Sequence, residues 1–431
     1  MADKQPLSNL NYAKINLDLG ATKEILKRLG NPEQSCKTIH VGGTNGKGST
    51  SSMIASILQE ADLKVGLYTS PHIESICERF SINNRLISPS ELIKLEEEVI
   101  AAALLPSPIK LTFFEISTVI AFLYFAKSKV DFAVIEVGLG GRLDSTNVIT
   151  PVATVITSIA KDHEDKLGKT LPAIGYEKAG IIKKKVPLIF NAKNSIAQQV
   201  IIDIAKEQEA DCYQLKVDFD LKRLADRYNR ECFSYFDDEL TIEEISSATI
   251  GAHQVENGAV AIKTAMVLRK QFALSLSSDQ IRSSFSKLQC KGRYEKVSKL
   301  PDITIDGAHN PAAISALISI LKERRKLGDV EIIFGVMCDK NYKRMLAIIA
   351  TYTEKISLYS PNEERAESLE KLESVAQNYF EYINLIENKD QLLSYILNMQ
   401  PDSKVLITGS FMTVGEIMKI LRNSDIIKPD K

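Results

Sequence analysis

A glycine-rich loop between an apolar strand and a helical pattern constrains the fold of this 431-residue chain more than any other feature. The sequence VGGTNGKGST (41–50) follows the apolar run 38–41 and opens a helical pattern over 48–60. Glycines let backbone N–H groups converge on phosphates, and a helix N-terminus favours anions. The strict phosphate-loop signature is GxxxxGK[ST], whereas here Gly48 follows the lysine. We predict a triphosphate site in which Lys47 bridges the β- and γ-phosphates and Ser49 or Thr50 reaches magnesium; the alternative is a glycine-rich turn without a ligand.

Short β-type runs alternate with longer helical patterns along the chain. The runs 132–137 and 152–156 are nearly continuous apolar stretches, which are typical of buried parallel strands. A stretch rich in Tyr, Phe, Thr and charges over 211–250 suggests antiparallel hairpins or an edge extension, and a second alternating series follows Arg293. The pattern predicts an α/β protein with a doubly wound phosphate-loop domain over 1–296 and a smaller Rossmann-like α/β domain over 297–431. The boundary is expected within Tyr294–Pro301.

Composition narrows the class of partner and the compartment. The formal net charge of −1 gives no basic footprint for nucleic acid or an anionic membrane. The six cysteines are scattered without a CxxC motif, which favours a reducing compartment. The N-terminal sequence has no apolar core of a signal peptide, and the most apolar run, 116–126, is too short to cross a bilayer and predicts a buried helix. We expect a cytoplasmic protein.

Polar side chains follow three predicted strands. Glu136 ends the run 132–135, Asp162 and His163 follow 152–156, and Ser70 and His72 follow 64–68. Because carboxyl ends of parallel strands meet at one sheet edge, these groups can surround the phosphate site. Glu136 is well placed for Mg²⁺, and His163 could be a neutral nitrogen ligand, with Asp162 either orienting it or capping the next segment. The alternatives are that Glu136 caps a strand end in solvent and that each histidine is structural.

Ten motifs in order resemble those of folylpolyglutamate synthase, including the bifunctional dihydrofolate synthase/folylpolyglutamate synthase type, within the Mur ligase superfamily. Together they span most of the chain. They are HVGGTNGKGST (40–50), YTSPH (68–72), LTFFE (111–115), EVGLGGRLDSTN (136–147), DHEDKLG (162–168), EKAGI (177–181), AHQVEN (252–257), GRYE (292–295), DGAHNP (306–311) and TGS (408–410).

The resemblance implies an ATP-dependent amide ligase of folate biosynthesis and folate polyglutamylation. MgATP would phosphorylate a carboxylate of dihydropteroate or a reduced folate, and the amine of L-glutamate would attack the acyl phosphate. The resemblance implies that Lys47, Lys178 and His309 are catalytic and that Ser70, Glu136 and His163 ligate magnesium, with two Mg²⁺ sites. The residues implied to contact ATP are Asn45, Gly46, Lys47, Gly48, Ser49, Asn257, Arg293 and Asp306.

Lys178 has two interpretations. From the residues alone it is a surface lysine of a helix over 172–183. The resemblance implies instead that it becomes carbamylated and places the second metal. Carbamylation needs the neutral amine, so burial is expected to lower the Lys178 pKa.

The resemblance also implies a pterin site formed by two segments. An aromatic pair suits stacking on a flat ring, and a carboxylate suits its amino-pyrimidine edge. For Phe113 and Phe114 core packing is the alternative, and we expect it for at least one of them. The residues concerned are Thr112, Phe113, Phe114, Glu115, Leu143, Asp144 and Ser145.

Some positions depart from the family, and other functions remain open. Cys290-Lys291 stands where Trp-Pro is common, Asn341 where a second Asp is common, and His40-Val41-Gly42 replaces the commoner Val-Ala step before the loop glycine. The alternatives are a synthase that accepts only folates, another Mur-type amino-acid ligase, a phosphate-loop kinase or NTPase, and an inactive ATP-binding scaffold. Against a cell-wall Mur ligase, only 37 residues precede the first predicted strand. Small-molecule substrates and a monomer are expected, without nucleic acid or membrane partners.

Overall fold

The computed structural model describes residues 16–227, 230–288, 290–424 and 426–427, which form two compact units. Of the described residues, the first unit takes 16–160, 164–227, 230–248 and 254–288. The second takes 161–163, 249–253 and the described residues from 290 onward. The chain therefore enters the second unit twice, briefly, before its C-terminal part begins. The domain limits expected from the sequence, 1–296 and 297–431, stay predictions.

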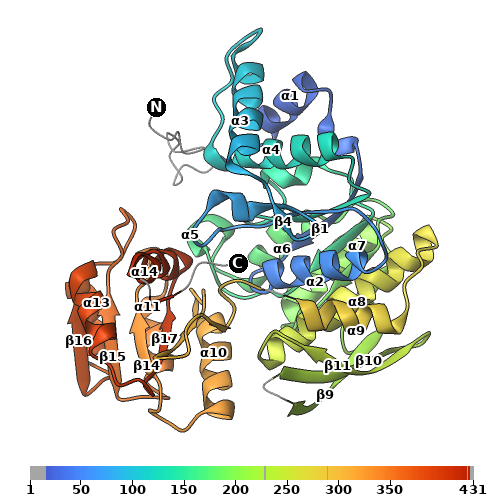
Figure 1. Cartoon of the computed structure of the whole chain (residues 1–431). Helices are drawn as coiled ribbons and strands as arrows, with labels where there is room; N and C mark the ends of the chain where they lie inside the picture. Colours follow the sequence, from blue (N-terminus) through green and yellow to red (C-terminus); the bar gives the residue numbers. More distant parts are fainter. Residues whose placement is uncertain (1–15, 228–229, 289, 425, 428–431) are drawn as a thin grey trace. The chain divides into compact units, whose positions relative to one another are not determined.

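The first unit is built on an eight-stranded sheet whose central strands are parallel (Figure 1). The loop-bearing strand β1 lies between β5 and β6, and only β3 pairs antiparallel with its neighbours, β2 and the edge strand β4. In sheet order the strands are β4 (Arg85–Leu86), β3 (Phe80–Ile82), β2 (Val65–Tyr68), β5 (Phe132–Glu136), β1 (Lys37–Gly42), β6 (Ala153–Ile156), β7 (Leu188–Phe190) and β8 (Cys212–Gln214). The register pairs Val41 with Glu136 and Gly42 with Ile156, so three strand ends meet beside the loop.

Helices cover this sheet on both faces because successive residues of a buried strand point to opposite sides. Ala133 and Ile135 of β5 join the core formed with α1, α3 and α4, whereas Phe132 packs against Phe272 of α8 with ring centroids 5.5 Å apart. Ile156 and Phe190 lie in a further core under α6 and α7. The helices are α1 (Gly20–Arg28), α2 (Lys47–Gln59), α3 (Pro89–Leu104), α4 (Phe113–Ser128), α5 (Glu164–Leu167), α6 (Leu171–Ala179), α7 (Ser195–Glu207), α8 (Ala252–Phe272) and α9 (Ser278–Lys287). Three short 3-10 turns accompany them: Pro32–Gln34, Ile76–Arg79 and Ser145–Val148.

The region 211–250 contains the antiparallel strands that its composition indicated. A three-stranded sheet in the order β11-β10-β9 adds to the first unit, and Phe233 of its central strand packs edge-on against Phe285 of α9. Its strands are β9 (Phe219–Arg227), β10 (Arg230–Asp237) and β11 (Thr241–Ser247).

The second unit repeats the strand–helix alternation on a six-stranded sheet, and the predicted two-domain α/β class is confirmed. All its pairings are parallel except that of the short edge strand β12. In sheet order the strands are β12 (Glu295–Lys296), β13 (Asp302–Ile305), β17 (Lys404–Thr408), β14 (Glu331–Phe334), β15 (Lys355–Tyr359) and β16 (Tyr382–Ile386). The helices are α10 (Pro311–Arg324), α11 (Tyr342–Ile349), α12 (Leu369–Ala376), α13 (Lys389–Leu397) and α14 (Phe411–Asn423).

The apolar run 116–126 lies in α4, whose residues are buried almost all the way round. In the part of the chain that the structure describes, no helix is both long and apolar enough to cross a bilayer. All six cysteines are free thiols.

Candidate active site

The glycine-rich loop joins β1 to α2 in the arrangement that the sequence predicted. Gly43 has φ +138° and Gly46, the residue before the helix, has φ +86°, both in the region that favours glycine. Lys47 begins α2, and its Nζ donates to the Thr44 carbonyl at 3.1 Å. The lysine therefore already lies over the loop, where its charge can meet an anion at the helix N-terminus.

The segment after β6 fixes the loop by several hydrogen bonds. The Thr44 N–H donates to the Ser158 carbonyl at 2.7 Å, and the Asn45 N–H donates to Ser158 Oγ at 3.0 Å. The Asn45 carbonyl accepts from Thr157 Oγ1 at 2.7 Å. A β-carbon at Gly46 would lie 2.5 Å from Asn257 Oδ1, so α8 also lies against the loop backbone. The loop backbone is therefore braced by the segment after β6 and by α8.

Gly43→Ala is expected to disrupt this loop. The new β-carbon would lie 2.1 Å from Thr157 Oγ1 and 3.0 Å from the Ser158 backbone nitrogen, in addition to the strain of its positive φ. Gly30→Ala is the matched control, since Gly30 has φ +82° but no neighbour within 4 Å of an added β-carbon. We expect Gly30→Ala to lower the free energy of unfolding by about 1 kcal/mol and Gly43→Ala by clearly more.

Urea unfolding and nucleotide titration check this prediction. Gly43→Ala should also weaken ATP binding by about tenfold or more, corresponding to the loss of about 1.4 kcal/mol of binding free energy. Equal stability losses at the two glycines, with unchanged ATP affinity, would contradict the tight packing of the loop.

Two of the three predicted magnesium ligands lie together in the first unit. Glu136 ends β5, is 2% exposed, and accepts from the Ser70 N–H at 2.9 Å through Oε2. A β-carbon at Gly48 would be 3.4 Å from the same oxygen, so the carboxylate faces the start of α2. Ser49 Oγ is buried there without a hydrogen-bond partner in the described structure. Hard oxygen donors and an unsatisfied hydroxyl beside the glycine-rich loop fit Mg²⁺.

Lys178 lies in α6 and is only 4% exposed, so the surface position that the residues alone indicated is wrong. Its Nζ donates to the Gly43 carbonyl at 2.8 Å. The helix is held close by Gly180, where a β-carbon would lie 2.3 Å from Arg142 Cβ. Lys178 is therefore a buried amine in contact with the glycine-rich loop.

The first predicted pterin segment begins α4. Thr112 and Glu115 form a capping box, in which Glu115 Oε2 accepts from the Thr112 N–H at 2.7 Å and Thr112 Oγ1 accepts from the Glu115 N–H. Phe113 is 4% exposed and packs in the core with the Arg79 guanidinium 5.0 Å from its ring, as expected for one of the two phenylalanines. Phe114 is half-buried, and its ring covers Gly138 so closely that a β-carbon there would lie 2.3 Å away.

In the second predicted pterin segment, the Asp144 carboxylate hydrogen-bonds to backbone N–H groups of its own loop. Its Oδ1 accepts from the Thr146 N–H at 3.0 Å and its Oδ2 from the Leu139 N–H at 2.8 Å. Burial raises the pKa of Asp144, and hydrogen bonds from Thr146 and the backbone oppose that rise. Leu143 is half-buried and Ser145 is buried. Asp144 therefore organises the loop that carries it, whatever else it binds.

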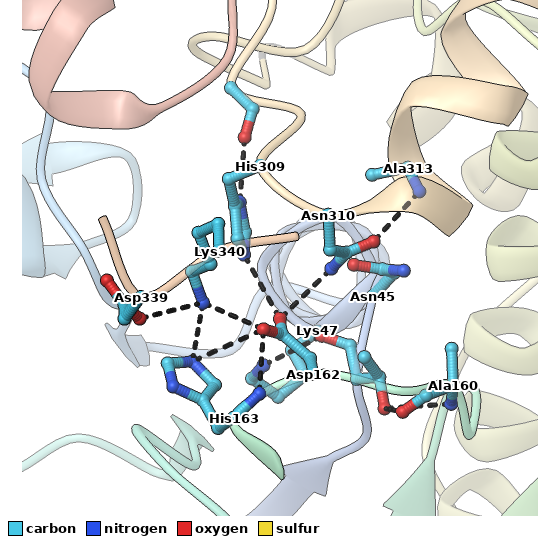
Figure 2. A network of polar contacts seen from close by, with 12 residues as sticks. Asn45, Lys47, Ala160, Asp162, His163, His309, Asn310, Ala313, Asp339 and Lys340 are labelled. Carbon is cyan, nitrogen blue, oxygen red and sulfur yellow. Dashed lines mark hydrogen bonds and ion pairs between the residues drawn. The ribbon is translucent and has the colours of Figure 1, made fainter. Parts of the chain in front are cut away.

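Asp162 and His163 belong to the second unit, where they form a charged cluster (Figure 2). Lys340 Nζ lies 2.7 Å from Asp162 Oδ1 and 3.2 Å from His163 Nε2. Asn310 Nδ2 donates to Asp162 Oδ2 at 3.0 Å, and His309 Nε2 lies 3.5 Å from that oxygen.

The electrostatics of this cluster follow from its contacts. Burial alone would raise the pKa of Asp162, but the hydrogen bond and charge of His309 and the charge of Lys340 hold it well below its usual range. Burial lowers the pKa of His163 to about 4, with Asp162 opposing and Lys340 adding to the shift. His163 is therefore neutral at pH 7, the state that a metal ligand requires.

The remaining predicted site residues also lie in the second unit. Arg293 stacks over the Phe411 ring at 4.7 Å. Asp306 accepts from the N–H groups of Tyr294 and Ala308, both at 2.8 Å. His309 donates from Nδ1 to the Gly307 carbonyl at 2.9 Å, which directs Nε2 towards Asp162.

Several residues in these clusters carried no predicted role. Lys340 follows the buried strand β14 by a few residues, the same strand-end signal that singled out Glu136, and could have been found by it. Ser158 and Thr157 follow β6 in the same way. Within the described residues no three His, Cys, Asp or Glu side chains are grouped so as to hold a metal ion.

Comparisons with known proteins cover nearly the whole chain. A model of the Mur ligase middle domain matches residues 41–265, and one of the Mur ligase glutamate ligase domain matches 292–411. A dihydrofolate synthase/folylpolyglutamate synthase of Bacillus subtilis is 37% identical over 412 residues, covering 94% of this chain and 95% of the relative. A folylpolyglutamate synthase of Lacticaseibacillus casei is 35% identical over 404 residues, covering 92% of each. The structure of Escherichia coli FolC in complex with DHPP and ADP superposes with a TM-score of 0.87 at 29% identity, covering 97% of this chain and 96% of that one.

Proposed function

This chain belongs to the folylpolyglutamate synthase family of the Mur ligases, and on that premise we propose that it joins L-glutamate to dihydropteroate, to reduced folates, or to both, at the expense of ATP. The acceptor carboxylate takes the γ-phosphoryl group of ATP and releases ADP. The amine of glutamate then attacks the acyl phosphate, and the tetrahedral intermediate collapses to an amide and phosphate. The proposal includes small-molecule substrates, a monomer and a cytoplasmic location.

The observation that carries the proposal is the match to both Mur ligase domains in a chain whose loop retains the groups for phosphoryl transfer. Lys47 lies over the loop, where it can neutralise charge on the transferring phosphoryl group. Loop N–H groups and the start of α2 would hold the triphosphate. The residues that would orient it are Asn45, Gly46, Gly48 and Ser49. A kinase would not need the second domain that the glutamate ligase model matches.

Magnesium would be held by Glu136 and by hydroxyl oxygens of Ser49 or Ser70, with His163 as a proposed further ligand. When bound it would supply positive charge to the phosphate oxygens. Lys178, as a carbamate, would add an anionic ligand for a second magnesium. The buried contact of Lys178 with Gly43 supports this role, since it places the side chain at the loop.

ADP release tests the proposal directly. The enzyme is supplied with MgATP and L-glutamate, and dihydropteroate is compared with tetrahydrofolate as acceptor. Turnover with both indicates a bifunctional enzyme, and turnover with tetrahydrofolate alone indicates a polyglutamate synthase only. ATP binding without glutamate-dependent turnover of either acceptor would overturn the proposal in favour of another Mur-type ligase.

A further inference from the structure

A chain of buried hydrogen bonds runs from the strand before the phosphate loop to Asp144. His40 lies in β1 and is fully buried, and its Nε2 is 2.8 Å from Thr146 Oγ1. Thr146 Oγ1 in turn donates to Asp144 Oδ1 at 2.5 Å. The function proposed above gives His40 and Thr146 no role.

The donor and acceptor in each of these hydrogen bonds follow from the groups that form them. The Thr146 hydroxyl donates its single proton to Asp144 Oδ1, and the two Asp144 oxygens also accept from the N–H groups of Thr146 and Leu139. Thr146 Oγ1 must then accept from His40, which places the hydrogen on Nε2. Burial lowers the pKa of His40 to about 3, so the ring is neutral and Nδ1 carries no hydrogen at pH 7.

His40 Nδ1 is a buried acceptor without a hydrogen-bond partner in the part of the chain described. Such a group destabilises a fold, and an apolar side chain of similar size would remove the cost. The hydrogen bond to Thr146 is therefore the feature that distinguishes histidine here.

We propose that His40 and Thr146 are positioning residues that fix the Asp144 carboxylate and its loop for binding the pterin end of the acceptor substrate. This rests on the proposed function, because it takes the segment 143–145 as part of the folate site. The Nε2–H of His40 orders the Thr146 hydroxyl, which holds Oδ1 of Asp144. Oδ2 holds the Leu139 N–H, so rotation of the carboxylate would also release the turn at 139.

Four single variants and one double variant test this role. In His40→Leu and Thr146→Val, we expect KM for the acceptor to rise about tenfold, as for one lost hydrogen bond to a charged group. The kcat and the KM for ATP should stay within about twofold, since the hydrogen bonds described for these two side chains lead to Asp144 and not to the glycine-rich loop. His40→Gln keeps an N–H donor and should restore most of the acceptor affinity. Thr154→Val is the matched control, because it removes a buried hydroxyl next to His40 that is outside the chain of hydrogen bonds, and it should leave KM unchanged.

The double variant His40→Leu/Thr146→Val shows whether His40 acts on Asp144 through Thr146 or whether the two residues act independently. The effects of substituting two residues that act through one another do not add. The double variant should therefore show about the same tenfold rise in KM for the acceptor as either single variant. A rise near a hundredfold, or equal effects on the KM for ATP and for the acceptor, would overturn the positioning role and indicate general damage to the sheet.

Nitrogen-15 NMR of the histidine rings gives a second readout that needs no turnover. The His40 signals are assigned by their loss in His40→Gln, and in the native protein they should show the Nε2–H tautomer between pH 6 and 8. Thr146→Val should change the His40 ring signals, because it removes the acceptor of the Nε2–H. An Nδ1–H tautomer in the native protein would overturn the proposed hydrogen-bond chain from His40 to Asp144. If native enzyme turns over neither dihydropteroate nor tetrahydrofolate, the proposed function fails and this substrate role with it. If native enzyme is active and the variants have its KM values, only the positioning role fails.

Discussion

Lys47→Ala is expected to lower ATP-dependent turnover on the order of a thousandfold, the scale typical of removing a group that stabilises transition-state charge. Lys47 is the first residue of α2, and its Nζ donates to the loop carbonyl of Thr44. The side chain is half-buried at a helix start and does not belong to a core cluster. Its loss should therefore remove catalysis while leaving the melting temperature within a few degrees of the native value.

Steady-state ADP release and thermal unfolding on the same samples measure these two effects. Lys94→Ala is the matched control, since Lys94 is an exposed lysine of a first-unit helix, α3, and its loss should leave turnover unchanged. Lys47→Arg keeps the charge but changes its shape, and we expect it to recover only part of the activity. Native turnover by Lys47→Ala would contradict the assignment of residues 41–50 as a phosphate loop.

The architecture was predictable because its elements carry strong local signals. The continuous apolar run that ends at Glu136 identified a strand buried on both faces, and the glycines before Lys47 identified a strand–loop–helix junction. Thr112 and Glu115 illustrate a local signal that we assigned to ligand binding alone. The spacing Thr-x-x-Glu before an apolar run also predicts a capping box, and the structure contains one.

Features that depend on long-range packing could not be read from the sequence. His163 follows β6 by a few residues, yet it belongs to the second unit and contacts Lys340, which is far away in the sequence. The burial of Lys178 depends on the close approach of α6 at Gly180 and not on the pattern of its own helix, which indicated a surface lysine. Periodicity reports which face of an element is apolar, but not which polar side chain the tertiary fold encloses.

Lys178→Ala is expected to reduce turnover on the order of a hundredfold or more, because it removes a buried group that contacts the phosphate loop. Native protein should also carry the added mass of one carbon dioxide on the peptide containing Lys178 when it is measured without acid. The chemistry requires attack of a neutral amine on carbon dioxide, and burial favours the neutral form of an amine. Loss of activity after removal of carbon dioxide, with recovery on adding bicarbonate, would separate a carbamate from a lysine that only holds the loop.

The neighbouring Lys184 provides the control for this experiment. It is 67% exposed and pairs with Glu209, so Lys184→Ala should keep full activity and should not change the mass at Lys178. Lys178→Arg retains a cation that can reach the Gly43 carbonyl but cannot form the carbamate. If Lys178→Arg is as active as the native enzyme and independent of bicarbonate, the residue acts by holding Gly43 in place, and the second magnesium site must be built without it. If both Lys178 variants are inactive and bicarbonate restores activity only to the native protein, the Lys178 amine is the precursor of a carbamate. Lys178→Arg would then be inactive because it keeps a positive charge but cannot form the anionic carbamate.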